Sequence, residues 1–454
     1  CFCKRQYTGR IKAPRRKLRM SLSPNDPILL TSSLHVDEAR KAIAHLVDAL
    51  IQESQSIGDA TSETVSLDQA INRILAQDLL SPINVPAADN SAMDGFAFDG
   101  KCLDTKESEV SLQVIGTALA GKPYEGSIGP GQCLKIMTGA LMPKGCDTVI
   151  PQELIDSQDQ DRITFKQNQL KAGNNRRLCG EDLQQGKPAI AAGRLLRPSD
   201  LGLAASLGIS SLQVKRKLKV AILSSGDELR SLGQPLDAGS IYDSNRYSLT
   251  GLLNRLNLDI IDCGIVRDDP ISLKAAFIKA ATQADVLISS GGVSVGEADF
   301  TKQIMQELGD VGFWKIAMRP GRPMAFGTLK AVPGKSRSTL FFGLPGNPVA
   351  VMVTFYQFVR AALLQLNGAS QTEPPLIQAI SEAPIRKKAG RTEFQRAILG
   401  RNAEGRPTVR ITGSQGAGIL RSMSEANCFV ILGHDQENIA AGDWVDIALF
   451  DGLL

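Results

Sequence analysis

The stretch KLKVAILSSGDEL (217–229) decides how the central part of this chain folds. A short continuous apolar run ends in small and acidic residues, which is typical of a buried parallel strand followed by a loop. Similar strand-like runs recur at DIIDCGIV (259–266), DVLISSGG (285–292), FWKIAM (313–318) and TLFFGL (339–344). Segments with helical spacing alternate with them, at 244–258, 270–284, 299–309 and 348–366. This alternation predicts a doubly wound, mostly parallel α/β domain.

The rest of the 454-residue chain is long enough for two or three further domains. Apolar residues recur at helical spacing in 35–54 and 67–80, whereas short β-like runs broken by Gly and Pro dominate from Gly95 to Lys171 and beyond position 373. The predicted parts are a basic tail (1–27), a linker and dimerisation domain (28–82 and 173–214), a small β domain (83–172), the α/β domain (215–368) and a C-terminal β-barrel-like domain (369–454).

The formal charge of +4 comes from one end of the chain. Residues 1–20 contain eight basic residues and no acidic one, so the remainder has 43 basic against 47 acidic residues. Residues 21–454 therefore carry a small net negative charge. Because nucleic acids are bound through basic surfaces that neutralise their phosphates, we expect no nucleic-acid binding. We expect residues 1–19 to be an upstream extension of a chain that starts at Met20, with a transit peptide as the alternative.

Cysteine and histidine usage limits the compartment and the metal chemistry. Apart from Cys1 and Cys3, the eight Cys are not at metal-ligand or redox spacing, which favours a reducing, cytoplasmic location. Three His argue against a His-based zinc or copper site. The longest uninterrupted apolar run is too short for a membrane span, so none is predicted.

Polar loops follow the predicted strands. Ligands of open parallel sheets bind beyond the carboxyl ends of the strands, so these loops should form one constellation. They are SSGDEL (224–229), RDDP (267–270), SSGGVSVGEAD (289–299), RPGRP (319–323) and PGNP (345–348). Any one of them is also compatible with an ordinary helix cap or turn.

Two chemistries share this predicted edge. Backbone N–H groups at Gly291, Gly292, Ser294 and the PGNP loop suit an anion, and Lys315, Arg319 and Arg322 add cationic donors. Carboxylates lie among them, at Glu228, Asp268, Asp269 and Asp299. A divalent cation would reconcile the two, and Mg²⁺ commonly bridges carboxylates to phosphate. Because neither GxxxxGK[ST] nor GxGxxG is present, the residues favour a Mg²⁺-dependent enzyme acting on a phosphorylated or nucleotide-like ligand.

The ordered set of motifs resembles the MoeA family of molybdopterin molybdenumtransferases, which is related to the gephyrin E domain. The resemblance runs from about residue 28 to the C-terminus. Its motifs are DNSAMDG (89–95), IMTGA (136–140), GED (180–182), SSGDEL, IYDSN (241–245), RDDP, SSGGVSVGEAD and GLPGNP (343–348).

The resemblance implies an activity and an assembly. Family enzymes receive adenylylated molybdopterin from a molybdopterin adenylyltransferase, release AMP with Mg²⁺, and insert molybdenum from molybdate. They form homodimers whose active site combines the α/β domain of one subunit with the DNSAMDG-bearing part of the other. A gephyrin-like binding scaffold and the adenylyltransferase step itself are the alternatives. The acidic cluster argues against the scaffold, and the additional β domains argue against the adenylyltransferase. Molybdenum and tungsten are not distinguished.

The resemblance also implies roles for individual residues. Acidic active-site positions fall on Glu228, Asp268 or Asp269, and Asp299, whereas Asp89 and Thr138 fall on positions contributed by the other subunit. Asp182 of GED is a further active-site candidate. The phosphate or nucleotide end would be held by Ser290, Gly291, Gly292 and Ser294, and molybdate would be attracted by Lys315, Arg319 and Arg322. Further binding candidates are Ser225, Gly226, Asp243, Pro345, Gly346, Asn347 and Pro348. Many relatives have Lys where this chain has Arg319 and Arg322. The positive charge is kept, but a compact ammonium group is replaced by a planar guanidinium with several fixed donors.

Overall fold

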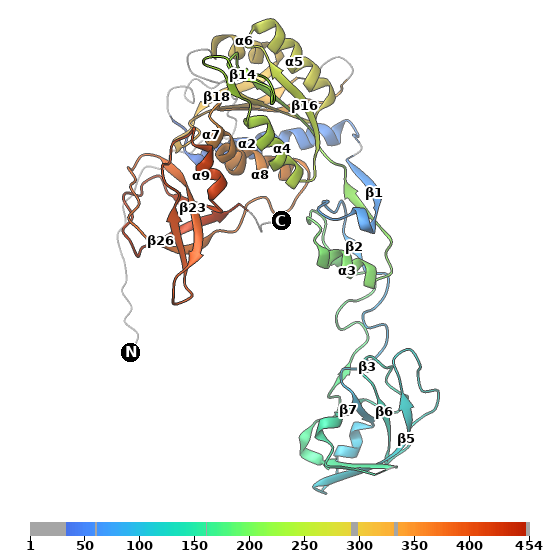
Figure 1. Ribbon diagram of the computed structural model, residues 1–454. Helices are drawn as coiled ribbons and strands as arrows, with labels where there is room; N and C mark the ends of the chain where they lie inside the picture. Colours follow the sequence, from blue (N-terminus) through green and yellow to red (C-terminus); the bar gives the residue numbers. More distant parts are fainter. Residues whose placement is uncertain (1–32, 60, 160, 292–297, 331–334, 451–454) are drawn as a thin grey trace, which may run out of the picture. The chain divides into compact units, whose positions relative to one another are not determined.

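The computed structural model describes residues 33–59, 61–159, 161–291, 298–330 and 335–450. The chain divides into two compact units (Figure 1). Unit 1 consists of Cys1–Glu63 and Lys215–Leu454, and unit 2 of Thr64–Val214. The chain passes between the units along β1 (Ser62–Ser66) and β12 (Ser211–Lys215), which pair with each other. The domain boundaries proposed from the sequence remain predictions.

Unit 1 is built on a six-stranded sheet with the order β16-β13-β17-β21-β20-β18. Its strands are β13 (Lys219–Ser225), β16 (Asp259–Val266), β17 (Val286–Ser290), β18 (Gly309–Lys315), β20 (Pro323–Leu329) and β21 (Thr339–Leu344). The first four strands in spatial order are parallel, and β20 is antiparallel to both of its neighbours. The predicted mostly parallel α/β architecture is confirmed.

Strand β20 is not among the predicted strands, and β18 begins four residues before the predicted FWKIAM. Glycines weaken the strand pattern in both segments. They lie where the two backbones approach closely: a Cβ at Gly327 would stand 2.1 Å from the Asp310 carbonyl oxygen, and one at Gly309 would stand 2.0 Å from that of Thr328. Gly is required there for packing, and sequence propensity does not register that requirement.

Helices cover both faces of this sheet (Figure 1). One face packs against α5 (Pro270–Gln283) and α6 (Ala298–Leu308). The other packs against α2 (Val36–Ser56), α4 (Asn245–Arg255) and a continuous helix made of α7 (Pro348–Thr354), the π-helical turn η5 (Phe355–Val359) and α8 (Arg360–Leu366). Side chains alternate along a strand, so each face of the sheet has its own core. Val220 and Ile222 pack on the side of α2 and α4, and Ala221 and Leu223 pack on the side of α5 and α6.

The helix over 348–366 is long and apolar enough to cross a membrane by length and composition. However, 67% of this segment is buried inside the protein, because it packs between the sheet, α2 and α4. That burial is what the core helix of a globular domain shows.

The C-terminal part of unit 1 is a closed five-stranded β-barrel, as predicted for a barrel-like domain. Its strands are β22 (Ile377–Ser381), β23 (Thr392–Arg401), β24 (Pro407–Ile411), β25 (Cys428–Leu432) and β26 (Trp444–Leu449). The barrel closes because β23 pairs with both β24 and β25. Helix α9 (Leu420–Glu425) lies beside β23, and the short strand β19 (Met318–Arg319) pairs with β23. Strands β14 (Leu229–Arg230) and β15 (Ile241–Tyr242) form a separate small ribbon.

Unit 2 contains a second six-stranded sheet, with the order β7-β4-β6-β5-β9-β8. Its strands are β4 (Gly95–Phe98), β5 (Glu109–Ala118), β6 (Gln132–Ile136), β7 (Thr148–Pro151), β8 (Ser157–Gln158) and β9 (Arg162–Lys166). The short elements around it are β2 (Leu79–Leu80) with β11 (Pro188–Ile190), β3 (Asn90–Ser91) with β10 (Arg176–Arg177), α3 (Pro198–Ser206), and the 3₁₀ turns η1 (Leu67–Gln69), η2 (Gly100–Leu103), η3 (Gln152–Leu154) and η4 (Gln167–Gln169).

The predicted helix at 67–80 is wrong. Only η1 is helical there, and Asn72 has a φ of 57°, which no right-handed helix accommodates. Its apolar residues Ala70 and Leu75 are instead buried with Ile190 and Leu212, so tertiary packing and not helical periodicity explains their spacing.

Candidate functional site

The register of the sheet brings the predicted loops of unit 1 to one edge. Ser224 at the end of β13 pairs with Ser290 at the end of β17, and Ser290 pairs with Leu344 at the end of β21. On the far side of β20, Lys315 at the end of β18 pairs with Pro323. Since β18 runs in the same direction as β21, this edge collects Ser225, Gly226, Gly291, the PGNP loop and Lys315. Gly292 and Ser294 lie outside the described residues.

Asn245, the first residue of α4, ties two of these loops together. Its Nδ2 atom donates to the Ser290 hydroxyl at 2.8 Å and to the Gly346 carbonyl at 2.7 Å. Asn245 lies within the IYDSN motif, but it is not among the predicted site residues. An amide at the start of a helix, between two small-residue loops, was the available signal.

Three buried polar atoms at the same edge have no hydrogen-bond partner among the described residues. They are Ser224 Oγ, Ser225 Oγ and Asn245 Oδ1, in residues that are 1%, 5% and 9% exposed. An unpaired buried polar group costs about 1–3 kcal/mol, so a folded protein rarely keeps several together without a functional reason. Their presence marks this edge as a binding site for a polar ligand.

The carboxylates lie on neighbouring loops. Asp227 Oδ1 accepts from the backbone N–H of Asp268 at 3.4 Å, which brings the SSGDEL and RDDP loops together. Glu228 is exposed, and its carboxylate folds back over Gly226, where a Cβ would stand 2.6 Å from Oε2. No group of three or more potential metal ligands occurs among the described residues, and the side chain of Asp299, at the start of α6, lies outside them.

Two predicted carboxylates have structural partners. Asp269 is the N-cap of α5, and the backbone N–H of Ser272, which bonds its Oδ1 at 2.9 Å, lowers its pKa. Asp243 is buried, and Oδ2 accepts from Arg246 Nε at 3.1 Å, while the same guanidinium reaches Asp262 at 2.5 Å. Both residues hold helix starts in place, and any metal or ligand contact would be additional to that.

The cationic residues lie on the turn between β18 and β20. Lys315, Arg319 and Arg322 are all exposed. The turn is fixed on two sides: the Leu34 N–H donates to the Lys315 carbonyl at 2.8 Å, and β19 pairs with β23 of the barrel. Arg322 also donates to Ser33 Oγ at 3.4 Å. The barrel therefore helps to position Arg319.

In unit 2, the three motifs that carry Asp89, Thr138 and Asp182 come together. Met142 donates its N–H to the Asp89 carbonyl and Gly139 to that of Ser91, which joins DNSAMDG to IMTGA and to the segment that follows it. Strand β3 of DNSAMDG also pairs with β10, just before GED. Asp182 and Thr138 are exposed and Asp89 is half-buried.

Each of these segments is held by a side chain. Asp89 Oδ1 accepts from the Cys179 N–H at 2.8 Å, and Oδ2 lies 3.7 Å from Arg176 Nε. Asp94 accepts from both the backbone N–H and the hydroxyl of Thr138 at 2.7 Å, and these two bonds lower its pKa. Asp94, Arg176 and Cys179 were not predicted as site residues, although Asp94 lies within the DNSAMDG motif.

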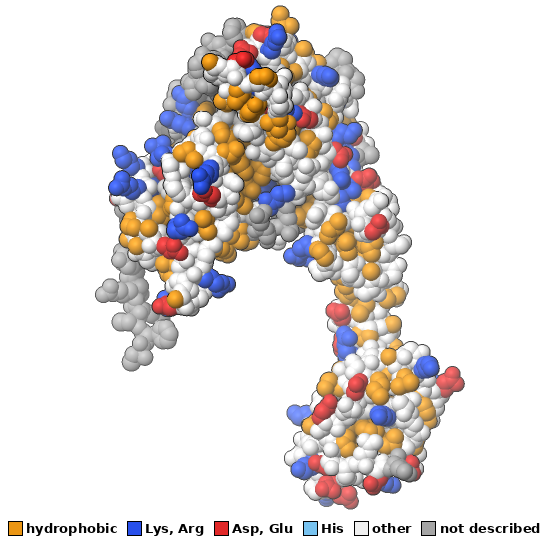
Figure 2. Space-filling view, viewed as in Figure 1, with side chains coloured by type: hydrophobic (Ala, Val, Ile, Leu, Met, Phe, Trp, Pro, Cys, Tyr) orange, Lys and Arg blue, Asp and Glu red, His pale blue; other side chains and the backbone are white. Residues whose placement is uncertain are grey.

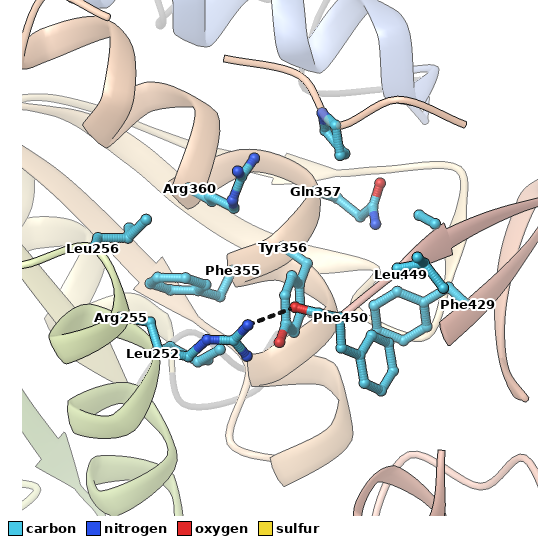
Figure 3. Close-up of a pocket in the computed structure, with 12 residues that line it drawn as sticks. Leu252, Arg255, Leu256, Phe355, Tyr356, Gln357, Arg360, Phe429, Leu449 and Phe450 are labelled. Carbon is cyan, nitrogen blue, oxygen red and sulfur yellow. Dashed lines mark hydrogen bonds between the residues drawn. The ribbon is translucent and has the colours of Figure 1, made fainter. Parts of the chain in front are cut away.

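A separate small pocket lies away from this edge (Figure 3). Its aromatic lining comes from the π-helical turn and the barrel, and Arg255 reaches the Phe450 carbonyl across it at 2.9 Å. The lining contains none of the predicted site residues. The site at the sheet edge and this pocket are therefore different features of unit 1.

Regions of known proteins match three successive parts of this chain. The MoeA N-terminal region (domain I and II) matches residues 34–208, a probable molybdopterin binding domain matches 221–365, and the MoeA C-terminal region (domain IV) matches 378–450. The molybdopterin biosynthesis moeA protein from Pyrococcus horikoshii OT3 has a similar structure, with a TM-score of 0.74 and 27% identity over 92% of this chain and all of that one.

Sequence relatives span most of the chain as well. A molybdopterin molybdenumtransferase from Haemophilus influenzae is 42% identical over 394 residues, which cover 87% of this chain and 95% of the relative. Another from Nostoc sp. is 34% identical over 403 residues, covering 88% and 91%. The domain matches and these identities show that this chain belongs to the MoeA family, the enzymes of molybdenum cofactor biosynthesis.

Proposed function

We propose that this protein takes up adenylylated molybdopterin and molybdate, hydrolyses the adenylate with water to release AMP and molybdopterin, and inserts molybdenum into the pterin dithiolene. The observation that carries the proposal is the edge where Ser225, Ser290 and Lys315 meet the Glu228 and Asp268 loops. Hydrogen-bond donors for an anion lie on the same edge as carboxylates. This combination suits a phosphoanhydride with a bound cation better than it suits an uncharged substrate.

Magnesium is the cation that this donor set suits. Mg²⁺ is usually held by one or two carboxylates together with substrate phosphates and water, so a two-carboxylate arrangement from Glu228 and Asp268 is sufficient. When bound, the cation would neutralise charge on the phosphate linkage. We assign Asp299 and Asp269 as further candidates, Asp269 in addition to its role as a helix cap.

Other residues would bind and orient the substrates. Ser290, Gly291 and the PGNP loop present donors to the phosphate end, and Lys315, Arg319 and Arg322 attract molybdate. When the two thiols of the pterin bind molybdenum, their protons leave with one molybdate oxygen as water, and the oxidation state of the metal does not change. The chain itself therefore needs no thiol nucleophile.

We further propose that the active form is a homodimer, in which Asp89, Thr138 and Asp182 of one subunit complete the site of the other. A cytoplasmic location and an upstream molybdopterin adenylyltransferase follow from the same reaction. Basic and acidic side chains are interspersed over the face in Figure 2, which supports the expectation that nucleic acid is not a partner.

The test is AMP release by the purified protein incubated with adenylylated molybdopterin, Mg²⁺ and molybdate. We expect Glu228→Ala and Asp268→Asn to lower the rate by at least about 100-fold, as expected for loss of an electrostatic group at the reacting phosphate. Glu404→Gln, at an exposed turn of the barrel, is the matched charge-removal control. No AMP from the wild type would refute the reaction, and undiminished rates in the first two variants would refute the site.

A further inference from the structure

The side-chain amide of Asn245 has a fixed orientation. One of its two partners, the oxygen of Gly346, belongs to a carbonyl and can only accept a hydrogen bond. Nδ2 must therefore point toward Gly346, and the Ser290 hydroxyl, 2.8 Å from the same nitrogen, must accept as well. The alternative amide orientation would place two oxygens in contact, so the hydrogen-bond network excludes it.

This orientation decides what the Ser290 hydroxyl does. A hydroxyl has one proton, and since Ser290 Oγ accepts from Asn245, that proton remains available for donation. No acceptor for it occurs among the described residues. Ser290 is the last residue of β17, followed by Gly291, and its register partner Ser224 carries another buried hydroxyl without a partner. Paired residues on parallel strands face the same side of a sheet, so both hydroxyls lie on the α4 side.

We propose that Asn245 is a positioning residue, which makes Ser290 a hydrogen-bond donor and holds the PGNP loop beside it, so that the two together bind the phosphate ester of molybdopterin. The identity of the ligand rests on the proposed function, whereas the hydrogen-bond relay does not. Asn245 acts on the ligand through Ser290 and Gly346.

The competing explanation is that Asn245 only stabilises the fold by linking two loops. That role would need only the two donated hydrogen bonds, and the direction of the Ser290 hydroxyl would not affect ligand binding. It would also leave the buried Ser224 hydroxyl unpaired, at a cost in stability, whereas a phosphate bound beside Ser290 would accept its proton. The relay predicts instead that the contributions of Asn245 and Ser290 to phosphate binding are coupled.

The experiment is a double-mutant cycle on the full chain. Anaerobic equilibrium binding would be measured for molybdopterin and for molybdopterin from which the phosphate has been removed enzymatically. We expect the wild type to prefer the phosphorylated form. Ser290→Ala and Asn245→Ala should each reduce that preference about tenfold, the usual effect of losing one hydrogen bond to a charged group. The double variant should lose no more than the larger single loss.

The controls separate the relay from a loss of folding. Asn254→Ala, at an exposed position of the same helix, should leave the preference unchanged. If Asn245→Ala does not fold, Asn245→Ser takes its place in the cycle, because a single hydroxyl proton cannot serve both Ser290 and Gly346. We then expect the same loss of preference, about tenfold, and the same absence of a further loss in the double variant.

Three results would overturn the proposal: additive losses in the cycle, equal losses for both ligands, or a wild type without preference for the phosphate. Failure of the proposed function is detected separately, as absence of AMP release, because the binding preference does not depend on turnover.

Discussion

The carbonyl oxygen of Ser225 lies so close to Gly291 that a Cβ at position 291 would stand 2.4 Å from it. Gly291 also has a φ of 89°, which favours glycine. We expect Gly291→Ala to destabilise unit 1 by about 3 kcal/mol and to abolish turnover, since the backbone at the substrate edge must move apart. Chemical denaturation and AMP release would measure the two effects.

Gly442 provides the control for backbone strain alone. Its φ is 91°, and a Cβ there would meet nothing within 4 Å. Gly442→Ala should cost about 1 kcal/mol and leave the rate unchanged. Equal effects of the two substitutions would show that the close approach to Ser225 does not matter.

Arg396 in the barrel is fully buried and forms no ion pair among the described residues. It donates to Ser422 Oγ and Gly416 O at 3.0 Å, and to the carbonyls of Ser414 and Gln415 at 3.3 Å. Burial, with a smaller effect of nearby Arg319, lowers its pKa to about 10. We expect Arg396→Ala to destabilise the protein by about 3 kcal/mol, because four acceptors lose their donor.

Arg396→Lys should not restore stability, because an ammonium group does not reproduce the planar fork. Arg421→Ala, whose side chain is 87% exposed, should change stability by less than about 0.5 kcal/mol. Thermal unfolding compares the three, and a stable Arg396→Ala variant would contradict the assignment.

Among the cysteines that the structure describes, Cys179 should react first with a thiol reagent. It is exposed, whereas burial raises the pKa of Cys133, Cys146 and Cys428 to about 12 and keeps them as thiols at pH 8. Peptide mass spectrometry after brief alkylation of the native protein would identify the order. Because the Cys179 backbone holds Asp89, labelling should also slow AMP release, and Cys179→Ser should remove that sensitivity.

Lys335 predicts a pH dependence of stability. Burial, reinforced by the charge of Arg216, lowers its pKa from 10.5 to about 8. Between pH 8 and 10.5 the unfolded state therefore binds more protons than the folded state, and this group's contribution to stability rises with pH. Melting temperatures of wild type and Lys335→Met should diverge over this range in favour of the wild type. Lys330→Met, at an exposed position, should track the wild type throughout.

The sequence determined the α/β class and the common edge of the loops around Ser225, Ser290 and Lys315. Continuous apolar runs alternating with helices allow few arrangements other than a parallel sheet, and parallel strands place their carboxyl ends together. DNSAMDG and IMTGA likewise stand out as motifs in the sequence, whereas their contact is a property of the fold.

Only the tertiary structure decided which polar residues are already engaged. Asp269 caps a helix and Asp243 pairs with Arg246, yet nothing in the sequence separates them from Glu228. Asn245 and Asp94 gained importance only through partners 101 and 44 positions away, Gly346 and Thr138. The spacing of apolar residues predicts which side chains of a single helix or strand are buried. A hydrogen bond between two elements depends instead on how those elements pack, and this packing involves the whole unit. The sequence pattern therefore located the site, whereas only the fold shows which residues contact each other there.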